Sequence, residues 1–202
     1  MANDIFEQLD QELESMKSVI IEDMDKLNNQ KASIVKELIE FFWQVWIRFD
    51  RIKVHFTIEP SPSTFALFKE YPDNWSFRPE FDFSAVNEIS ITDKTQDQGR
   101  IGDRIIVNFY NIEKSVHMRI LFEYCDGEHY YKYSGWKRIF SQQIIYDCPL
   151  DKAKTQKVYE VLSVILKIWF ESHLRRNREL IIKHMKDNFE KGETFTTGEA
   201  KY

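Results

Sequence analysis

The sequence predicts an α+β fold in which an antiparallel sheet is flanked by two long helices. Three features carry this prediction: a strand-and-turn pattern from Arg104 to Tyr146, and two tracts without glycine or proline, Met1 to Glu59 and Leu150 to Lys191. Glycine and proline are the residues that most disfavour a helix interior, so each tract can form a long helix. We expect a central meander of about five strands, with the second helix packed on its apolar face.

Two turns fix the expected register of the meander. Asp126-Gly127 is a favoured type I′ hairpin turn, and centring the hairpin there pairs Phe122 with Tyr131. The preceding hairpin must turn within residues 112–115. Both turns select the same strand face. The side chains expected to be buried on this face are Ile105, Val107, Phe109, Met118, Ile120 and Phe122.

The last hairpin of the meander leaves two registers open. Ser134-Gly135 is a plausible turn, and a two-residue loop there directs Trp136, Arg138 and Phe140 to the apolar face. A three-residue loop brings Ile139 inward instead. Because neither register suits the whole segment, we expect a β-bulge between Trp136 and Gln142.

The amino-terminal tract carries the apolar spacing of an amphipathic helix or a coiled coil. The apolar residues recur at steps of three and four: Phe6, Leu9, Leu13, Met16, Ile20, Met24 and Leu27, then Ile34, Leu38, Phe42, Val45, Phe49 and Ile52. Asn28-Asn29-Gln30 allows either one continuous helix or a helical hairpin. An unbroken helix would be roughly 72 Å long. A compact chain of this size is only about 43 Å across, so the helix must fold back or project.

The remaining segments complete the expected order. Lys53–Glu59 and Val86–Thr92 alternate as strands. Ser61–Glu80 follows Pro60 and contains three further prolines, so it is expected to be irregular, and Asp93–Asp103 is expected to be a mobile loop. The closing helix should begin after Asp151 as its N-cap and continue to about Glu190, with Gly192 ending it. We therefore expect a helical region at 1–52, the sheet with its closing helix at 53–191, and a disordered tail at 192–202.

Composition and charge narrow the classes of function. The net charge is −5, with −6 in residues 1–40 and +4 in residues 151–191, so general binding to nucleic acid is not expected. Two cysteines make no disulfide framework, and no Cys/His spacing typical of a metal site occurs. No signal peptide or apolar run long enough to cross a bilayer is visible. We expect a cytoplasmic protein without a cofactor or a metal.

A first candidate site lies on the meander. The hairpin registers above bring an arginine among aromatic side chains, an arrangement that can hold an anionic or planar ligand. The candidate ligand-binding residues are His129, Tyr131, Tyr133, Trp136 and Arg138. The alternative is a core aromatic cluster from which a bulge displaces Arg138 toward solvent.

A second candidate site lies at the start of the closing helix. Lys152, Lys154 and Lys157 place positive charge where the helix dipole is already positive, which could serve an anion or an acidic peptide. Neutralisation by neighbouring acidic residues is the alternative explanation. Further along the helix there is a second basic set: Arg175, Arg176, Arg178, Lys183 and Lys186. They could form a helical face for nucleic acid, and a solvated face or one that pairs with the acidic amino-terminal helix explains them as well.

The leading functional expectation is a non-enzymatic interaction or adaptor module that forms a homodimer through its amino-terminal helix. The rival is a ligand-binding domain with a pocket between the sheet and the closing helix near Trp136 and Arg138. An enzyme of unknown class is the third possibility, because no phosphate loop, nucleophile elbow or Cys/His catalytic signature is present and no catalytic residue is predicted.

Overall fold

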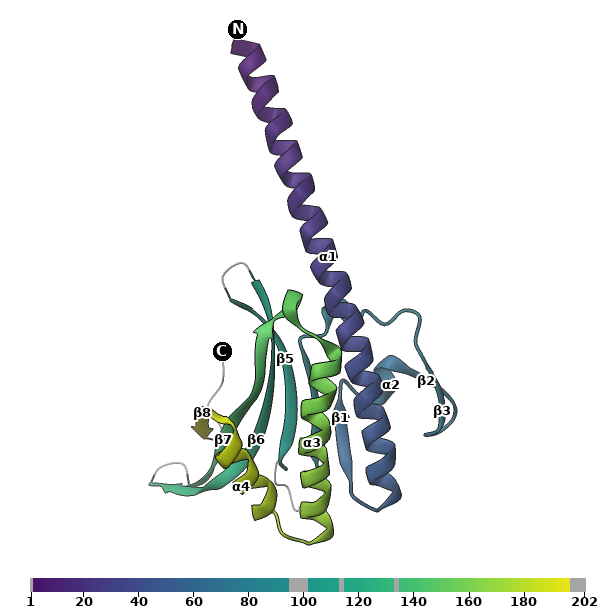
Figure 1. The fold of residues 1–202 in the computed structure, drawn as a ribbon, viewed down its shortest axis with the longest axis vertical. Helices are drawn as coiled ribbons and strands as arrows, with labels where there is room; N and C mark the ends of the chain where they lie inside the picture. Colours follow the sequence, from purple (N-terminus) through teal and green to yellow (C-terminus); the bar gives the residue numbers. More distant parts are fainter. Residues whose placement is uncertain (1, 95–101, 113–114, 133–134, 197–202) are drawn as a thin grey trace.

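A computed structural model of the chain describes residues 2–94, 102–112, 115–132 and 135–196. The predicted α+β class is confirmed (Figure 1). The elements are α1 (Ala2–Arg51), β1 (Phe56–Glu59), α2 (Pro62–Phe65), β2 (Ala66–Glu70), β3 (Asn74–Phe77), the 3-10 helix η1 (Phe83–Ala85), β4 (Glu88–Asp93), β5 (Arg104–Ile112), β6 (Ser115–Tyr131), β7 (Gly135–Pro149), the 3-10 helix η2 (Leu150–Lys152), α3 (Thr155–Leu174), α4 (Glu179–Asn188) and β8 (Glu190–Thr196).

The main sheet has six antiparallel strands in the order β1-β4-β5-β6-β7-β8. The predicted pairing of β5 with β6 is confirmed, since Val107 lies opposite Ile120 and Phe109 opposite Met118. These side chains are buried on the face that the second half of α1, α3 and α4 cover (Figure 1). One hydrophobic core therefore joins the helices to the sheet.

The predicted hairpin at Asp126-Gly127 is wrong. β6 continues through these residues and turns only after Tyr131, so Phe122 lies opposite Gln143 rather than Tyr131. A type I′ turn needs a positive φ at both central residues, and neither Asp126 nor Gly127 has one. The strand accommodates the two residues as a bulge instead.

The bulge expected between Trp136 and Gln142 is present at Ile139 and Phe140, but the extra residue belongs to the opposite strand, β6. Cys125 pairs with Phe140 and Gly127 pairs with Ile139, which leaves Asp126 as the additional residue. A further shift places an extra residue, Ile145, on β7. Bulges bend a strand and increase its twist, which helps this sheet to curve around the helices.

Helix α1 is continuous through Asn28-Asn29-Gln30, so the alternative of a helical hairpin is excluded. The Gln30 side chain donates a hydrogen bond to the Leu150 carbonyl at 2.8 Å, and Lys31 donates to the Asn87 side chain at 2.8 Å. These contacts mark where the domain begins to cover the helix. Towards the amino terminus, α1 projects beyond the rest of the molecule as an arm (Figure 1).

A small hairpin of β2 and β3 occupies the segment that was expected to be irregular. It lies on the side of α1 away from the main sheet (Figure 1). Its aromatic side chains gather around the fully buried Trp43 of α1, whose ring is 5.4 Å from Phe68 and 5.8 Å from Trp75. The second half of α1 is thus buried from two sides.

The prediction of a single closing helix is also wrong. The segment forms two helices, α3 and α4, and Asp151 lies in η2 while Lys154 occupies the N-cap of α3. Glu190–Thr196 form β8 at the sheet edge where a disordered tail was expected, and residues 197–202 lie outside the described residues. None of the helices in the described part of the chain combines the length and apolar character that crossing a bilayer requires.

Candidate functional site

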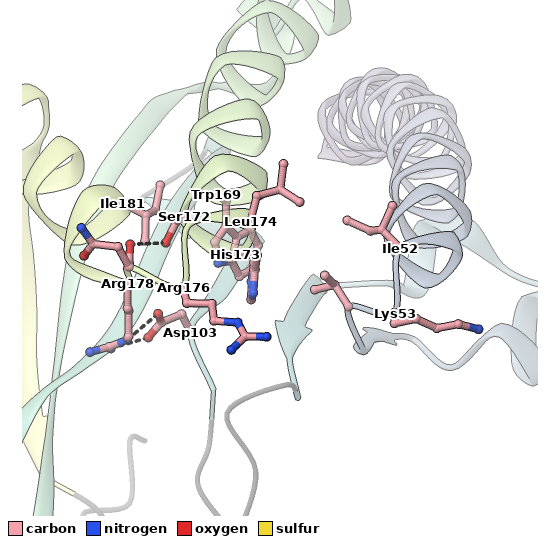
Figure 2. Close-up of a pocket in the computed structure, with 12 residues that line it drawn as sticks. Ile52, Lys53, Asp103, Trp169, Ser172, His173, Leu174, Arg176, Arg178 and Ile181 are labelled. Carbon is pink, nitrogen blue, oxygen red and sulfur yellow. Dashed lines mark hydrogen bonds and ion pairs between the residues drawn. The ribbon is translucent and has the colours of Figure 1, made fainter.

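A cavity of about 520 Å³ lies between the carboxyl-terminal ends of α1 and α3 (Figure 2). Its wall combines apolar side chains with charged ones, which is the composition of a small-molecule site. The apolar part includes Ile52, Val54 and Trp169, and the polar part includes His173 and Arg176. Most of the loop that connects β4 to β5 lies outside the described residues, but both of its ends are described and reach this region.

The two helices end at the cavity in the same way. In each case the backbone forms a Schellman motif: Val54 N–H donates to the Phe49 carbonyl after α1, and Asn177 N–H donates to the Ser172 carbonyl after α3. The left-handed position of this motif is usually glycine, yet here it is Lys53, at φ 63°, and Arg176, at φ 51°. Such a conformation costs an ordinary residue roughly 1–2 kcal/mol. A lysine and an arginine therefore occupy backbone positions that glycine would adopt at a lower cost in free energy.

His173 and Asp93 form a close pair at the inner side of the cavity. Nε2 of His173 is 3.2 Å from Oδ2 of Asp93, and the Asp93 side chain is fully buried. Gly102 allows this arrangement, because a Cβ at that position would stand 1.6 Å from the Asp93 carbonyl oxygen. The close approach lets Asp93 N–H donate to the Asp103 carbonyl at 2.9 Å, so the buried Asp93 lies next to Asp103, which lines the cavity.

Asp103 is bound by Arg178. The guanidinium donates to both carboxylate oxygens, with Nε at 2.7 Å from Oδ2, and it also donates to the Cys125 carbonyl at 2.9 Å. Burial raises the pKa of Asp103 above its ordinary value, although the hydrogen bonds and charge of Arg178 oppose that shift. Arg178 thus ties the α3–α4 junction to β5 and β6.

Lys53 and Arg176 differ from Arg178 in their partners. Neither forms an ion pair with any residue in the described ranges. Ser172, the one hydroxyl on the cavity wall, donates to the Asn177 carbonyl at 2.8 Å. The arrangement can hold an anion, and the Ser172 proton is engaged away from His173.

The predicted aromatic site is not assembled as expected. The register pairs His129 with Lys137 and Arg138 with Glu128, so His129 and Arg138 lie on opposite faces of the β6–β7 ribbon. Arg138 forms an ion pair with Glu128 at 3.4 Å. Tyr131 pairs in register with Gly135 and Trp136 with Tyr130, while Tyr133 lies outside the described residues. The expected cluster depended on a two-residue loop at Ser134-Gly135, and the observed β6–β7 register differs from the one that this loop would give. Ligand binding at these residues stays a prediction.

The predicted lysine site lies at the start of α3. Lys152, Lys154 and Lys157 are all exposed, and Lys157 has Glu160 at 3.9 Å. Asp147, one of the expected neutralising residues, is instead bound by Arg119 at 2.6 Å and by the Tyr110 hydroxyl. Anion binding at these lysines stays a prediction.

The basic residues of the closing segment do not form one helical face. Arg176 and Arg178 lie in the break between α3 and α4, and Lys186 binds Asp126 at 2.8 Å. No glycine or proline marks this break in the sequence. The end of α3, and with it the cavity, could therefore not be predicted. Gly102-Asp103 was the one local signal, because a glycine beside a strand can mark a close backbone approach.

The arm of α1 is a second candidate, as a surface rather than a cavity. Every side chain from Gln11 to Lys26 is exposed, including a set of large apolar residues whose exposed fractions lie between 49% and 62%. These residues are Leu13, Met16, Val19, Ile20, Ile21 and Met24, and we call them the arm stripe. A contiguous apolar stripe of this kind is typical of an interaction surface.

The cavity and the arm stripe are thus the two features of the described chain from which a function can be argued. Comparisons of this chain with protein-family models, with curated proteins and with solved structures found no match.

Proposed function

We propose that this protein is a non-enzymatic interaction module that self-associates through the arm of α1. The exposed arm stripe is the observation that supports the proposal most directly. An isolated helix in water is marginal unless its apolar face is packed, so a projecting helix with such a face gains most from a partner. The spacing of three and four residues in the stripe is the spacing that coiled-coil partners recognise.

The direction of the arm stripe supports an antiparallel arrangement of two copies. Ile20 and Leu38 are 18 residues apart, about five helical turns, so they share one face of α1. Leu38 is fully buried against the chain's own domain. In a parallel pair, the partner helix would continue beyond Gln30 along the face that the chain's own domain covers. In an antiparallel pair, the partner helix continues toward its own domain at the opposite end of the stripe.

The arm is mainly acidic. Residues 11–27 carry five acidic and two basic side chains, and Glu22, Asp23 and Asp25 cluster near the base of the arm. A parallel pair would place the two acidic clusters at one level, where like charges repel each other. An antiparallel pair centred on the stripe separates these clusters but places Asp23 and Asp25 near Glu14 and Glu12 of the other copy. The charge of the arm therefore does not select the orientation, and the buried Leu38 face carries the antiparallel proposal.

Light scattering on the full-length protein tests this proposal. We expect a particle of twice the 24.4 kDa chain mass at micromolar concentration. The double variant Met16→Glu/Ile20→Glu should be monomeric, because it places charge in the apolar contact while keeping good helix formers. A monomeric wild type, or a double variant that still dimerises, would refute self-association through the stripe.

The double variant Ser15→Glu/Ser18→Glu is the matched control. It adds the same charge on the opposite side of the helix, since these positions lie about 140° and 160° around the axis from Ile20. Both serines are exposed. We expect this control to dimerise like the wild type, within the small effect that added surface charge has on association.

A further inference from the structure

We propose that the cavity between the ends of α1 and α3 binds a small organic anion, in which a carboxylate or phosphate group is attached to an apolar or aromatic group. This inference does not depend on the proposed self-association, because none of the cavity residues belongs to the arm stripe. It extends the function of the domain from association to ligand binding.

Arg176 is the residue that would bind the anionic group. It follows the last turn of α3, and Figure 2 shows its side chain reaching below His173 toward the end of α1. Its left-handed backbone, at φ 51°, occupies a position that glycine normally fills. Strained backbone in a non-glycine residue is often retained for function. A guanidinium without a carboxylate partner in the described residues is suited to bidentate contact with a carboxylate or phosphate.

An arginine without a carboxylate partner in the described residues favours an anion at the cavity. Of the two buried aspartates near it, Asp103 is bound by Arg178, and Asp93 lies 3.2 Å from His173. Arg176 adds a positive charge that forms no ion pair with a carboxylate in the described ranges. An incoming anion would compensate this charge, whereas a cationic ligand would increase the repulsion.

The walls of the cavity indicate the apolar part of the ligand. Trp169 and Val54 lie inside it, and Ile52 and Leu174 stand at the surface with 38% and 63% of their area exposed. The volume of about 520 Å³ is within the range of sites that hold small organic molecules. A bare inorganic anion would leave these apolar side chains in water, so an aryl or alkyl anion should bind more tightly.

Thermal unfolding of the full-length protein with phenyl phosphate, benzoate and inorganic phosphate tests the proposal. We expect both aryl anions at about 10 mM to raise the Tm, since a ligand that binds only the folded state stabilises it. Inorganic phosphate should raise it less. No shift with either aryl anion would overturn the proposal, and equal shifts from inorganic phosphate would overturn its apolar part.

Arg176→Gly separates a binding role from a structural one. Because glycine adopts the left-handed conformation readily, this variant should melt at or above the Tm of the wild type while its affinity for the aryl anions falls at least about tenfold. Unchanged affinity would exclude Arg176 as the anion-binding residue. Should the glycine variant melt below the wild type, Arg176→Gln makes the same test, because it removes the charge and keeps a long polar side chain.

Lys53→Gly is the matched control for the backbone change. This variant also replaces a residue of left-handed backbone conformation by glycine, at the end of the other helix, where Lys53 has φ 63°. The Lys53 side chain points away from Arg176 in Figure 2. We therefore expect its affinity for the aryl anions to stay within about threefold of the wild type. Equal losses in the two glycine variants would assign the effect to the backbone and overturn the role of Arg176.

Discussion

Asp126 shows how a single bulged residue can be accommodated within a continuous strand. It is the extra residue of the bulge in β6, and its carboxylate accepts hydrogen bonds from Lys186 of α4 at 2.8 Å and from Ser141 of β7 at 3.1 Å. The Lys186 hydrogen bond lowers the pKa of Asp126, so the carboxylate stays charged in this contact. The bulge is therefore held from both neighbouring elements, and β6 can continue past a dipeptide that otherwise favours a turn.

Ile120→Ala should be strongly destabilising. Ile120 is fully buried in the centre of the sheet face that the helices cover, opposite Val107 on β5. Removing its outer carbons loses apolar burial and leaves a cavity, which should lower the free energy of unfolding by about 2–5 kcal/mol in urea denaturation. A loss below about 0.5 kcal/mol would mean that the face is not part of the core.

Ile112→Ala is the control for this change. Ile112 is the same residue type at the end of β5, but 43% of its surface is exposed. The same deletion of carbons should cost less than about 1 kcal/mol, because little packed surface is lost. A comparable cost at both positions would show that the loss at Ile120 reflects strand propensity rather than burial.

At the scale of elements, the sequence predicted what periodicity can encode. The β5–β6 register followed from alternation, because Val107, Phe109, Met118 and Ile120 form one apolar face in only one pairing. Helix α1 was predicted from apolar residues that recur at steps of three and four. The small hairpin of β2 and β3 was missed because its strands cover Trp43 through scattered aromatic residues rather than a regular alternation.

The cavity could not be predicted for a related reason. It depends on two helix ends that carry Lys53 and Arg176 where glycine is the usual signal. Without a glycine, the sequence gives no local sign that α3 ends, and the closing segment was predicted as one helix. The expected aromatic cluster depended on the β6–β7 register, and the observed pairing places His129 and Arg138 on opposite faces.

The orientation of the α1 arms can be tested with Met24→Cys in a Cys125→Ser/Cys148→Ser background. In a parallel, in-register pair the two introduced cysteines would face each other and form a disulfide, which requires Cα atoms within about 7 Å. In the antiparallel pair that we propose, they lie further apart, and the dimer should stay reduced under mild oxidation in non-reducing electrophoresis. Rapid formation of a covalent dimer would contradict the antiparallel arrangement.

At the scale of the whole molecule, α1 divides into an exposed arm and a second half that packs into the domain. The side chains of residues 11–26 are exposed, whereas those of the second half of α1 enter the common core. Gln30 and Lys31 make the first hydrogen bonds from α1 to the domain. Folding of the domain and association of the arm should therefore be separable.

Deletion of Met1–Leu27 tests this separation. The truncated protein should be a monomer in light scattering, because the arm stripe is gone, while its domain keeps a cooperative thermal transition within a few degrees of the full-length protein. The reason is that the remaining residues of α1 carry the packing contacts, including the buried Trp43 and Leu38. A truncated protein that still dimerises would place the contact elsewhere on the domain. Loss of the cooperative transition would mean that the arm supports the fold, and the Tm of the full-length protein should then rise with protein concentration.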